Sequence, residues 1–236
     1  MSNLSQRALS IAVFALVALT SAVAARADQV VITTAPGATT SGGPVSARAT
    51  LTVSPAGTLT VVVQNLQPNI TDVAQAISDF SFTTTGTTGG TLSSSSGQQI
   101  TVNNGGTFTL GSTTATGWGL DPVAGGNFHI TALGNIGPAG LIIGPPGAGN
   151  LYSNANGSIA GNGPHNPFIN QSATFTFSIA GLTSVSQISN FTFSFGTVPG
   201  ITVPGTPTPE PASMILLGTG LVGAAGGIRR RRRNRG

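Results

Sequence analysis

The chain has 236 residues, and only 6% of them are charged, whereas about a quarter of the residues of an ordinary soluble domain are charged. Between residues 28 and 208 there is one arginine, Arg48, against four aspartates, a charge of 1 − 4 = −3, so nucleic acid is excluded as a partner because too few cations are present to bind phosphates. With no cysteine, no lysine and two histidines, the chain also has little from which to build a catalytic acid–base pair, a cofactor site or a metal cage.

Residues 1–27 have the layout of a secretory signal peptide. One arginine precedes an apolar run, Ala8–Leu19, and small residues follow that run. The run is too short for a membrane-spanning helix, which needs about 17–25 residues. Signal peptidase is therefore the first expected partner. Of two small-x-small sites we favour the one at Ala25 and Ala27 over the one that ends at Ala24, because a β-like run starts directly after Ala27.

Residues 28–200 contain short runs of β-branched and aromatic residues, bounded by Gly, Pro, Ser and Asn. In Ala173–Ile179 the apolar side chains fall on every second residue, which puts them on one inward face and leaves Ser and Thr facing water. This pattern predicts an all-β domain, a single β-sandwich of the jelly-roll or Greek-key kind. The expected strands are Gln29–Thr34, Ala47–Val53, Thr58–Gln64, Asp79–Thr84, Gln99–Val102, Thr107–Leu110, Phe128–Ala132, Ala173–Ile179 and Asn190–Gly196.

Residues 28–200, which we call the body, contain a weak internal sequence repeat, which we call the echo. Residues 60–82 and 175–193 each hold a strand, a turn, a Gln-Ile-Ser step and a Phe-x-Phe strand, and the first copy has one extra residue before the isoleucine. The echo favours two sheets built from similar hairpins, with chance similarity in a Ser/Thr/Phe-rich chain as the alternative. Residues 70–80 have a second interpretation, a short helix, because their apolar residues are three and four positions apart.

Residues 134–166 depart from the strand pattern, because Gly, Pro and Asn crowd around one apolar run, Leu141–Ile143. Such a composition predicts an inserted loop, and loops of this length are usually functional or mobile. Aromatic rings can stack on sugars, and side-chain amides can form hydrogen bonds to sugar hydroxyls. Four residues in or before this loop are therefore candidate glycan contacts: Trp118, Tyr152, Asn154 and Asn156. The alternative, which we favour, is that Trp118 fills the core and the asparagines occupy turns.

The sequence contains no convincing catalytic, cofactor or metal site. His129 and His165 are far apart, Asp121 is the acid nearest in sequence to His129, and no Gly-x-Ser-x-Gly elbow is present. Threonine steps are frequent but irregular along the chain, so no flat ice-binding array is expected. We expect a structural or adhesive role, with a carbohydrate- or ice-binding module as the first alternative and an extracellular hydrolase as the second.

The C-terminal end is built as a membrane tail. Residues 201–211 carry prolines at alternate positions and predict an extended, accessible spacer. Ala212–Ile228 is a stretch of 17 uncharged residues, just long enough for a transmembrane helix. The Arg-rich residues 229–236 should stay in the cytoplasm and leave the body outside. The residues expected to stop translocation are Arg229, Arg230, Arg231, Arg232 and Arg233.

Pro209-Glu210-Pro211, the apolar stretch and the arginine cluster together resemble the PEP-CTERM sorting signal of exported bacterial proteins. The resemblance covers only the tail, and some tails of this kind are also catalogued as the C-terminal segment of ice-binding proteins. It implies that Pro209, Glu210 and Pro211 are recognised by an exosortase, a membrane enzyme that cuts at or near the motif. It also implies that the tail anchors the protein transiently in the inner membrane before the protein is released to the envelope or the surroundings. The exopolysaccharide there is a further candidate partner.

Overall fold

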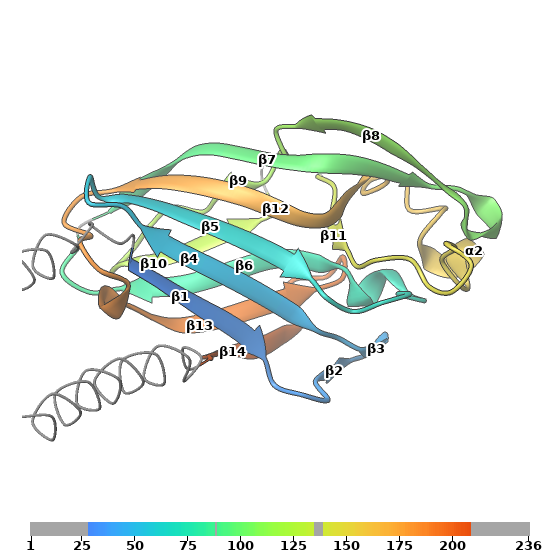
Figure 1. Ribbon diagram of the computed structural model, residues 1–236, viewed down its shortest axis with the longest axis horizontal. Helices are drawn as coiled ribbons and strands as arrows, with labels where there is room; N and C mark the ends of the chain where they lie inside the picture. The colour runs from blue at the N-terminus through green and yellow to red at the C-terminus, as the bar shows by residue number, and fades with distance from the viewer. Residues whose placement is uncertain (1–27, 88, 135–138, 209–236) are drawn as a thin grey trace, which may run out of the picture. The chain divides into compact units, whose positions relative to one another are not determined.

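A computed structural model describes residues 28–87, 89–134 and 139–208 (Figure 1). By compactness the chain divides into two units, residues 1–206 and residues 207–236. The predicted signal helix in residues 1–27, transmembrane helix in residues 212–228 and cytoplasmic tail in residues 229–236 lie outside the described residues.

The described chain is mostly β, as the alternating pattern predicts. The strands are β1 Asp28–Thr34, β2 Thr39–Thr40, β3 Gly43–Pro44, β4 Ala47–Val53, β5 Thr58–Asn65, β6 Ile77–Thr84, β7 Gly90–Val102, β8 Phe108–Thr114, β9 Gly119–Leu120, β10 Asn127–Thr131, β11 Ile142–Ile143, β12 Phe168–Ile179, β13 Ile188–Phe195 and β14 Thr202–Pro207. One four-residue helix, α2 (Ala155–Ser158), and three single 3-10 turns, Val73–Gln75, Asn104–Gly106 and Val185–Gln187, complete the elements.

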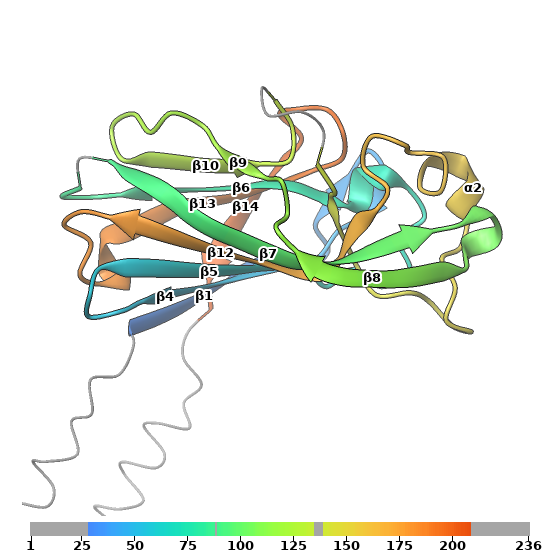
Figure 2. The same ribbon diagram turned by 90° about the horizontal axis from the view of Figure 1, so that it is seen from above.

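Eight strands close into a barrel. In order of pairing they are β12, β5, β4, β1, β14, β13, β6 and β11, and β11 pairs again with β12. The short strand β11 makes this closure because Ile142 lies opposite both Ile169 of β12 and Ile77 of β6. Strands β7 and β8 extend outward from β12, and strands β10 and β9 extend from β6 (Figure 2). Strands β2 and β3 form a separate small hairpin (Figure 1).

The predicted β-sandwich is therefore wrong, because the two sheets are joined at both sides by segments that the sequence assigns to a loop and a spacer. The Gly/Asn/Pro-rich loop supplies β11, whose two isoleucines are fully buried. Residues 202–207 are extended and mostly exposed, as expected, yet they form β14 and pair with β13, with Pro204 opposite Thr192. Alternating prolines thus do not prevent a ladder here, since proline removes only its own N–H.

Alternation of side chains puts phenylalanines from three barrel strands, β6, β12 and β13, and from the added strand β10 into one packed interior. The rings of Phe82 and Phe128 stack with centroids 5.1 Å apart, and Phe177 meets Phe82 edge-on at 5.8 Å. Phe80 packs against Phe193 at 5.0 Å. Burying each such ring stabilises the fold by about 1.5–3 kcal/mol. These contacts join β6 to β10, β12 and β13, and so fix the strand faces on which the outward-facing residues lie.

The short-helix interpretation of residues 70–80 is mostly wrong. Only Val73–Gln75 forms a single 3-10 turn, and β6 begins two residues later at Ile77. The turn starts at Asp72, whose side chain accepts a hydrogen bond from the N–H of Ala74. The apolar spacing of this segment therefore reflects a capped turn followed by a buried strand.

Candidate functional site

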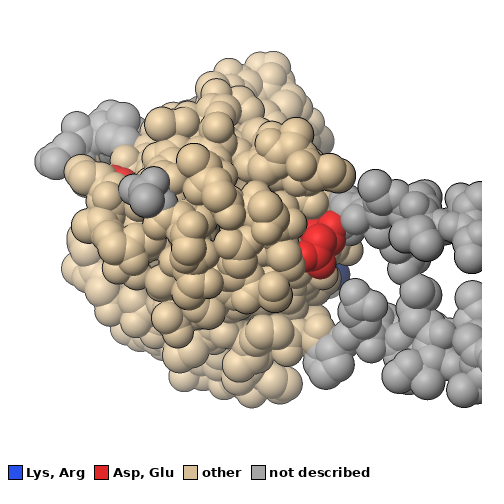
Figure 3. All heavy atoms as spheres, turned by 90° about the vertical axis from the view of Figure 1, so that its left-hand side faces the viewer, with Lys and Arg blue, Asp and Glu red and all other residues tan. Residues whose placement is uncertain are grey.

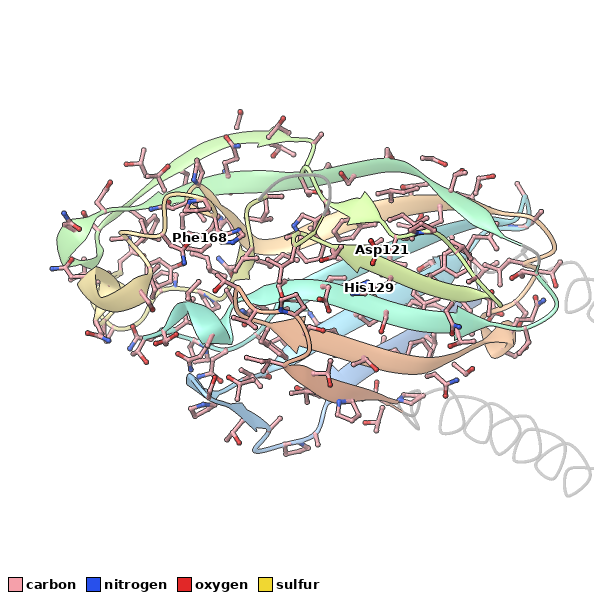
Figure 4. All side chains as sticks on the ribbon, turned by 180° about the vertical axis from the view of Figure 1, so that it is seen from behind. Asp121, His129 and Phe168 are labelled. Carbon is pink, nitrogen blue, oxygen red and sulfur yellow. The ribbon has the colours of Figure 1, made fainter. Side chains whose placement is uncertain are left out.

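Two aspartates flank one histidine, His129, on the outer face of β6 and β10. Figure 4 labels His129 and one of the two aspartates, Asp121. Phe128 and Ile130 of β10 point inward, so the alternation turns His129 outward. Its Nδ1 lies 2.7 Å from Oδ2 of Asp121, which follows β9 directly. Its Nε2 lies 3.4 Å from Oδ2 of Asp79 on β6. This Asp79–His129–Asp121 cluster is the densest group of ionisable side chains in the described part of the chain.

The cluster holds His129 in its charged form. Hydrogen bonding to Asp79 is the largest cause, hydrogen bonding to Asp121 adds to it, and partial burial opposes both, so the pKa of His129 rises from 6.5 to about 9. At neutral pH the cluster contains one imidazolium and two nearby carboxyl groups. The arrangement ties the loop after β9 to the centre of β6, because Asp121 also donates its backbone N–H to the carbonyl of His129.

The cluster is poorly suited to catalysis or to metal binding. Both ring nitrogens of His129 face carboxylates, so neither is left to accept a proton from a serine or threonine hydroxyl. Within residues 28–87, 89–134 and 139–208, no three His, Cys, Asp or Glu side chains are arranged to hold a metal ion. The geometry is that of ion pairs that connect β10 to β6 and to the residue after β9.

Sequence reasoning missed Asp79, because it took Asp121 as the nearest acid to His129. The pairing of β10 with β6 places Asp79 opposite Thr131, two residues along the strand from His129 and therefore on the same face. The side chain of Asp79 is only 5% exposed. The alternation of Asp79, Ser81 and Thr83 with apolar residues places these three side chains on one outer face of a strand. It does not show which strand pairs with that one, so His129 cannot be recognised as the partner of Asp79 from the sequence.

The two aromatic residues among the predicted glycan contacts lie inside the protein. Trp118 is 4% exposed, donates its indole N–H to the carbonyl of Gly140 at 2.8 Å, and packs against Phe175. Tyr152 is 1% exposed, and its hydroxyl donates to the carbonyl of Gly144 at 2.8 Å. Neither ring presents a face on which a sugar can stack.

The two asparagines from that set are exposed and bind backbone groups. The side chain of Asn154 donates to the carbonyl of Thr71, and that of Asn156 accepts from the N–H of Gly105. They flank and form α2, and Asn154 has the left-handed φ of 56° that asparagine tolerates well. Glycan contact at Trp118, Tyr152, Asn154 and Asn156 stays a prediction, and in the structure these residues do not form a common surface.

His165 is separate from the cluster. It is buried, and its Nδ1 lies 2.7 Å from the carbonyl oxygen of Ala139, to which it donates. The bond anchors the segment before β11 to the segment before β12. The two histidines therefore stabilise different parts of the fold.

At the start of the body, Asp28 is the first described residue and is fixed by the third 3-10 turn, Val185–Gln187. Its carboxylate accepts a hydrogen bond from the hydroxyl of Ser184 at 2.6 Å and one from the N–H of Val185 at 2.8 Å. The predicted signal-peptidase residues Ala25 and Ala27 lie just before it, outside the described residues.

The remaining predicted sites, the motif Pro209-Glu210-Pro211 and the arginines of residues 229–233, also lie outside the described residues. Comparison with protein families matches residues 207–233 to the PEP-CTERM protein-sorting motif. The chain carries a PEP-CTERM sorting signal. No curated protein and no solved structure matches the chain.

The PEP-CTERM match is confined to residues 207–233. It makes the chain an exported protein that is sorted by an exosortase and whose C-terminus is transiently anchored in the membrane. Among the described residues, no helix has the length and apolar character to span a bilayer. Sorting is therefore a property of residues 207–233, and any further role belongs to the body.

Proposed function

We propose that this protein is a non-catalytic structural component of the cell surface or extracellular matrix, delivered there by exosortase sorting. The observation that carries the proposal is the order of the parts. Strand β14 ends at Pro207, and the sorting motif begins at that residue. A cut at the motif would therefore release all strands of the barrel together and remove only the tail.

The body supports a passive role in two ways. Both ring nitrogens of His129 are paired with carboxylates, so this imidazole is not free to act as a base. Its surface is almost uncharged: Figure 3 shows one side of the molecule, where neutral residues make up nearly all of the described surface. A neutral, hydroxyl-rich exterior suits a protein that resides among hydrated polymers and must not bind ions or nucleic acid tightly.

Cell fractionation with intact-mass measurement tests the sorting. We expect the mature protein in the envelope or matrix fraction to begin at Asp28 and to lack residues 212–236. A Glu210→Ala variant should keep its tail and stay in the membrane fraction, whereas the neighbouring Thr208→Ala variant should be processed normally. Recovery of secreted wild-type protein with residues 212–236 intact would contradict the proposal.

A substrate screen tests the absence of catalysis. Polysaccharide, ester and peptide substrates are incubated with the wild-type protein and with a His129→Gln variant, which removes the only imidazole in the acid cluster. We expect no turnover by either protein. Turnover by the wild type that disappears in the variant would assign the protein to the hydrolases.

A further inference from the structure

Outward-facing hydroxyls from four neighbouring strands lie in register on one side of the barrel. Strands β4, β5, β12 and β7 lie side by side in Figure 1. One row across them pairs Thr52 with Thr60, Thr60 with Thr176, and Thr176 with Ser94. Rows on either side complete what we call the hydroxyl face: Thr50, Thr52, Thr58, Thr60, Thr91, Ser94, Ser96, Thr174, Thr176 and Ser178.

The hydroxyl face forms a grid of rows across the strands although threonine spacing along the sequence is irregular; Val62 interrupts one row, and the register of β7 shifts between Ser94 and Thr91. Neighbouring strands lie about 4.7–4.9 Å apart, and side chains on one face of a strand repeat about every 6.7 Å. Each hydroxyl at a grid point can donate one hydrogen bond and accept two. The strand registers, which the sequence does not reveal, are what align these groups.

Most of these hydroxyls have no hydrogen-bond partner in the part of the chain that the structure describes. Within the described residues, only Thr52 of the hydroxyl face has a hydrogen-bonded side chain, which accepts from Nε2 of Gln29 at 3.2 Å. Some hydroxyls elsewhere are bonded internally, such as those of Thr71 and Thr183 in the two glutamine-capped turns. The grid is therefore available to an external ligand that donates and accepts hydrogen bonds in return.

The chemistry of the face excludes several kinds of partner. Arg48 is the one charged side chain on the outer side of these strands, which is too little for nucleic acid or an anionic polymer. Val31 on β1 and Val62 on β5 are the outward apolar residues, which is too little for the apolar centre of a protein interface or for a lipid surface. An open sheet face also lacks the walls that enclose a small molecule.

We propose that the hydroxyl face binds a neutral, extended polysaccharide. Such a chain carries the same donor and acceptor groups as the face, has no charge to leave unpaired, and is long enough to contact several grid rows. Neighbouring strands twist by about 20–25°, so the grid is not planar, and a flexible chain can follow it whereas a crystal plane of ice cannot. This inference rests on the proposed function only in requiring that the body lie outside the cell.

A depletion assay with the purified full-length protein in a detergent without sugar groups tests the proposal. The probes are insoluble cross-linked dextran and cellulose, with carboxymethyl cellulose as the anionic comparison, at a salt concentration that screens the tail arginines. The test variant is Thr60→Val/Thr176→Val, which removes two central hydroxyls and keeps side-chain shape. The control is Thr192→Val on β13, a half-exposed threonine that is paired on both sides but lies on a barrel strand outside the hydroxyl face.

We expect the wild type to bind a neutral probe, the double variant to bind about tenfold more weakly, and the control to bind like the wild type. Unfolding transitions of all three proteins should coincide, since valine suits a strand as well as threonine does. No binding to either neutral probe, or equal binding by the double variant, overturns the proposal. Binding only to carboxymethyl cellulose, or inhibition of ice growth without polysaccharide binding, also overturns it.

This assay is independent of the sorting experiment. It uses purified protein and reports on residues of the body, whereas the sorting experiment reports on the tail. Failure of the polysaccharide assay with normal tail removal would leave the exported structural role in place. Failure of tail removal with intact binding would refute the sorting and keep the hydroxyl face.

Discussion

The side-chain oxygens of Gln187 and Gln75 each accept three hydrogen bonds, and the two sets come from equivalent positions of two similar turns. Gln187 receives them from the N–H and the hydroxyl of Thr183 and from the N–H of the next residue. Gln75 receives them from the N–H and the hydroxyl of Thr71 and again from the next N–H. The strands around the turns also pair with each other, β5 with β12 and β6 with β13, so the sequence echo corresponds to a pseudo-twofold relation in the fold.

The two glutamines should differ in their contribution to stability. Gln75 is 3% exposed, so Gln75→Ala should lower the free energy of unfolding by about 1–3 kcal/mol because buried N–H groups lose their acceptor. Gln187 is only partly buried, so water can take its place more easily and Gln187→Ala should cost about 0.5–1.5 kcal/mol. Urea unfolding measures both, with the exposed Gln29→Ala as control. Equal losses for the two turns would contradict the burial argument.

The acid cluster should make stability depend on pH in the alkaline range. The pKa of His129 is raised to about 9 in the folded protein from 6.5, so the ion pairs stabilise the fold fully below pH 6.5 and are lost as pH rises through about 9. Burial raises the pKa of Tyr152 beyond its ordinary range, so this tyrosine stays neutral over the same window. The wild type should therefore lose stability between about pH 6 and about pH 10.

A His129→Gln variant is the control for this pH dependence. Glutamine keeps a polar side chain on β10 and does not titrate, so the loss of stability between about pH 6 and about pH 10 should be clearly smaller than in the wild type. A direct NMR titration of the His129 imidazole should show a midpoint well above 6.5. A midpoint at or below that ordinary value would mean that the carboxylates do not hold the proton.

Packing around Gly205 distinguishes a barrel strand from a free spacer. A Cβ at this position would lie 2.6 Å from Cγ2 of Ile32 and 3.0 Å from Cε2 of Phe193. Gly205→Ala should therefore destabilise the barrel by about 1–3 kcal/mol, because both neighbours belong to the packed interior. Thr202→Ala, an exposed position of the same strand, should have little effect. If both substitutions were neutral in thermal unfolding, residues 202–206 would be a spacer after all.

The sequence predicts the strands with strong alternation and misses the elements that depend on distant partners. Ala173–Ile179 alternates strictly, and β12 contains it in full. Strand β11 is two residues long, and nothing local separates Ile142 and Ile143 from a buried loop until β6 and β12 are in place. Closure of the barrel is therefore a long-range property that local pattern does not encode.

The same reasoning applies to the surfaces. His129 is recognisable as an ionisable residue from the sequence, but its buried partner Asp79 comes from another strand and depends on the register of β6 with β10. The row that contains Thr60 and Thr176 depends in the same way on the register of β5 with β12. The sorting signal, in contrast, is contiguous in the sequence and can be recognised without knowledge of the fold.

Trp118, the only tryptophan, reports on the core and separates the glycan interpretation from the packing interpretation. Its burial and its bond to Gly140 predict blue-shifted emission that acrylamide quenches weakly in the folded protein and strongly in urea. Trp118→Ala should lower the free energy of unfolding by about 3–5 kcal/mol, because a large ring leaves a cavity against Phe175. Soluble dextran bound at the hydroxyl face should leave this emission unchanged, whereas stacking of a sugar on the indole would shift it and contradict the buried placement.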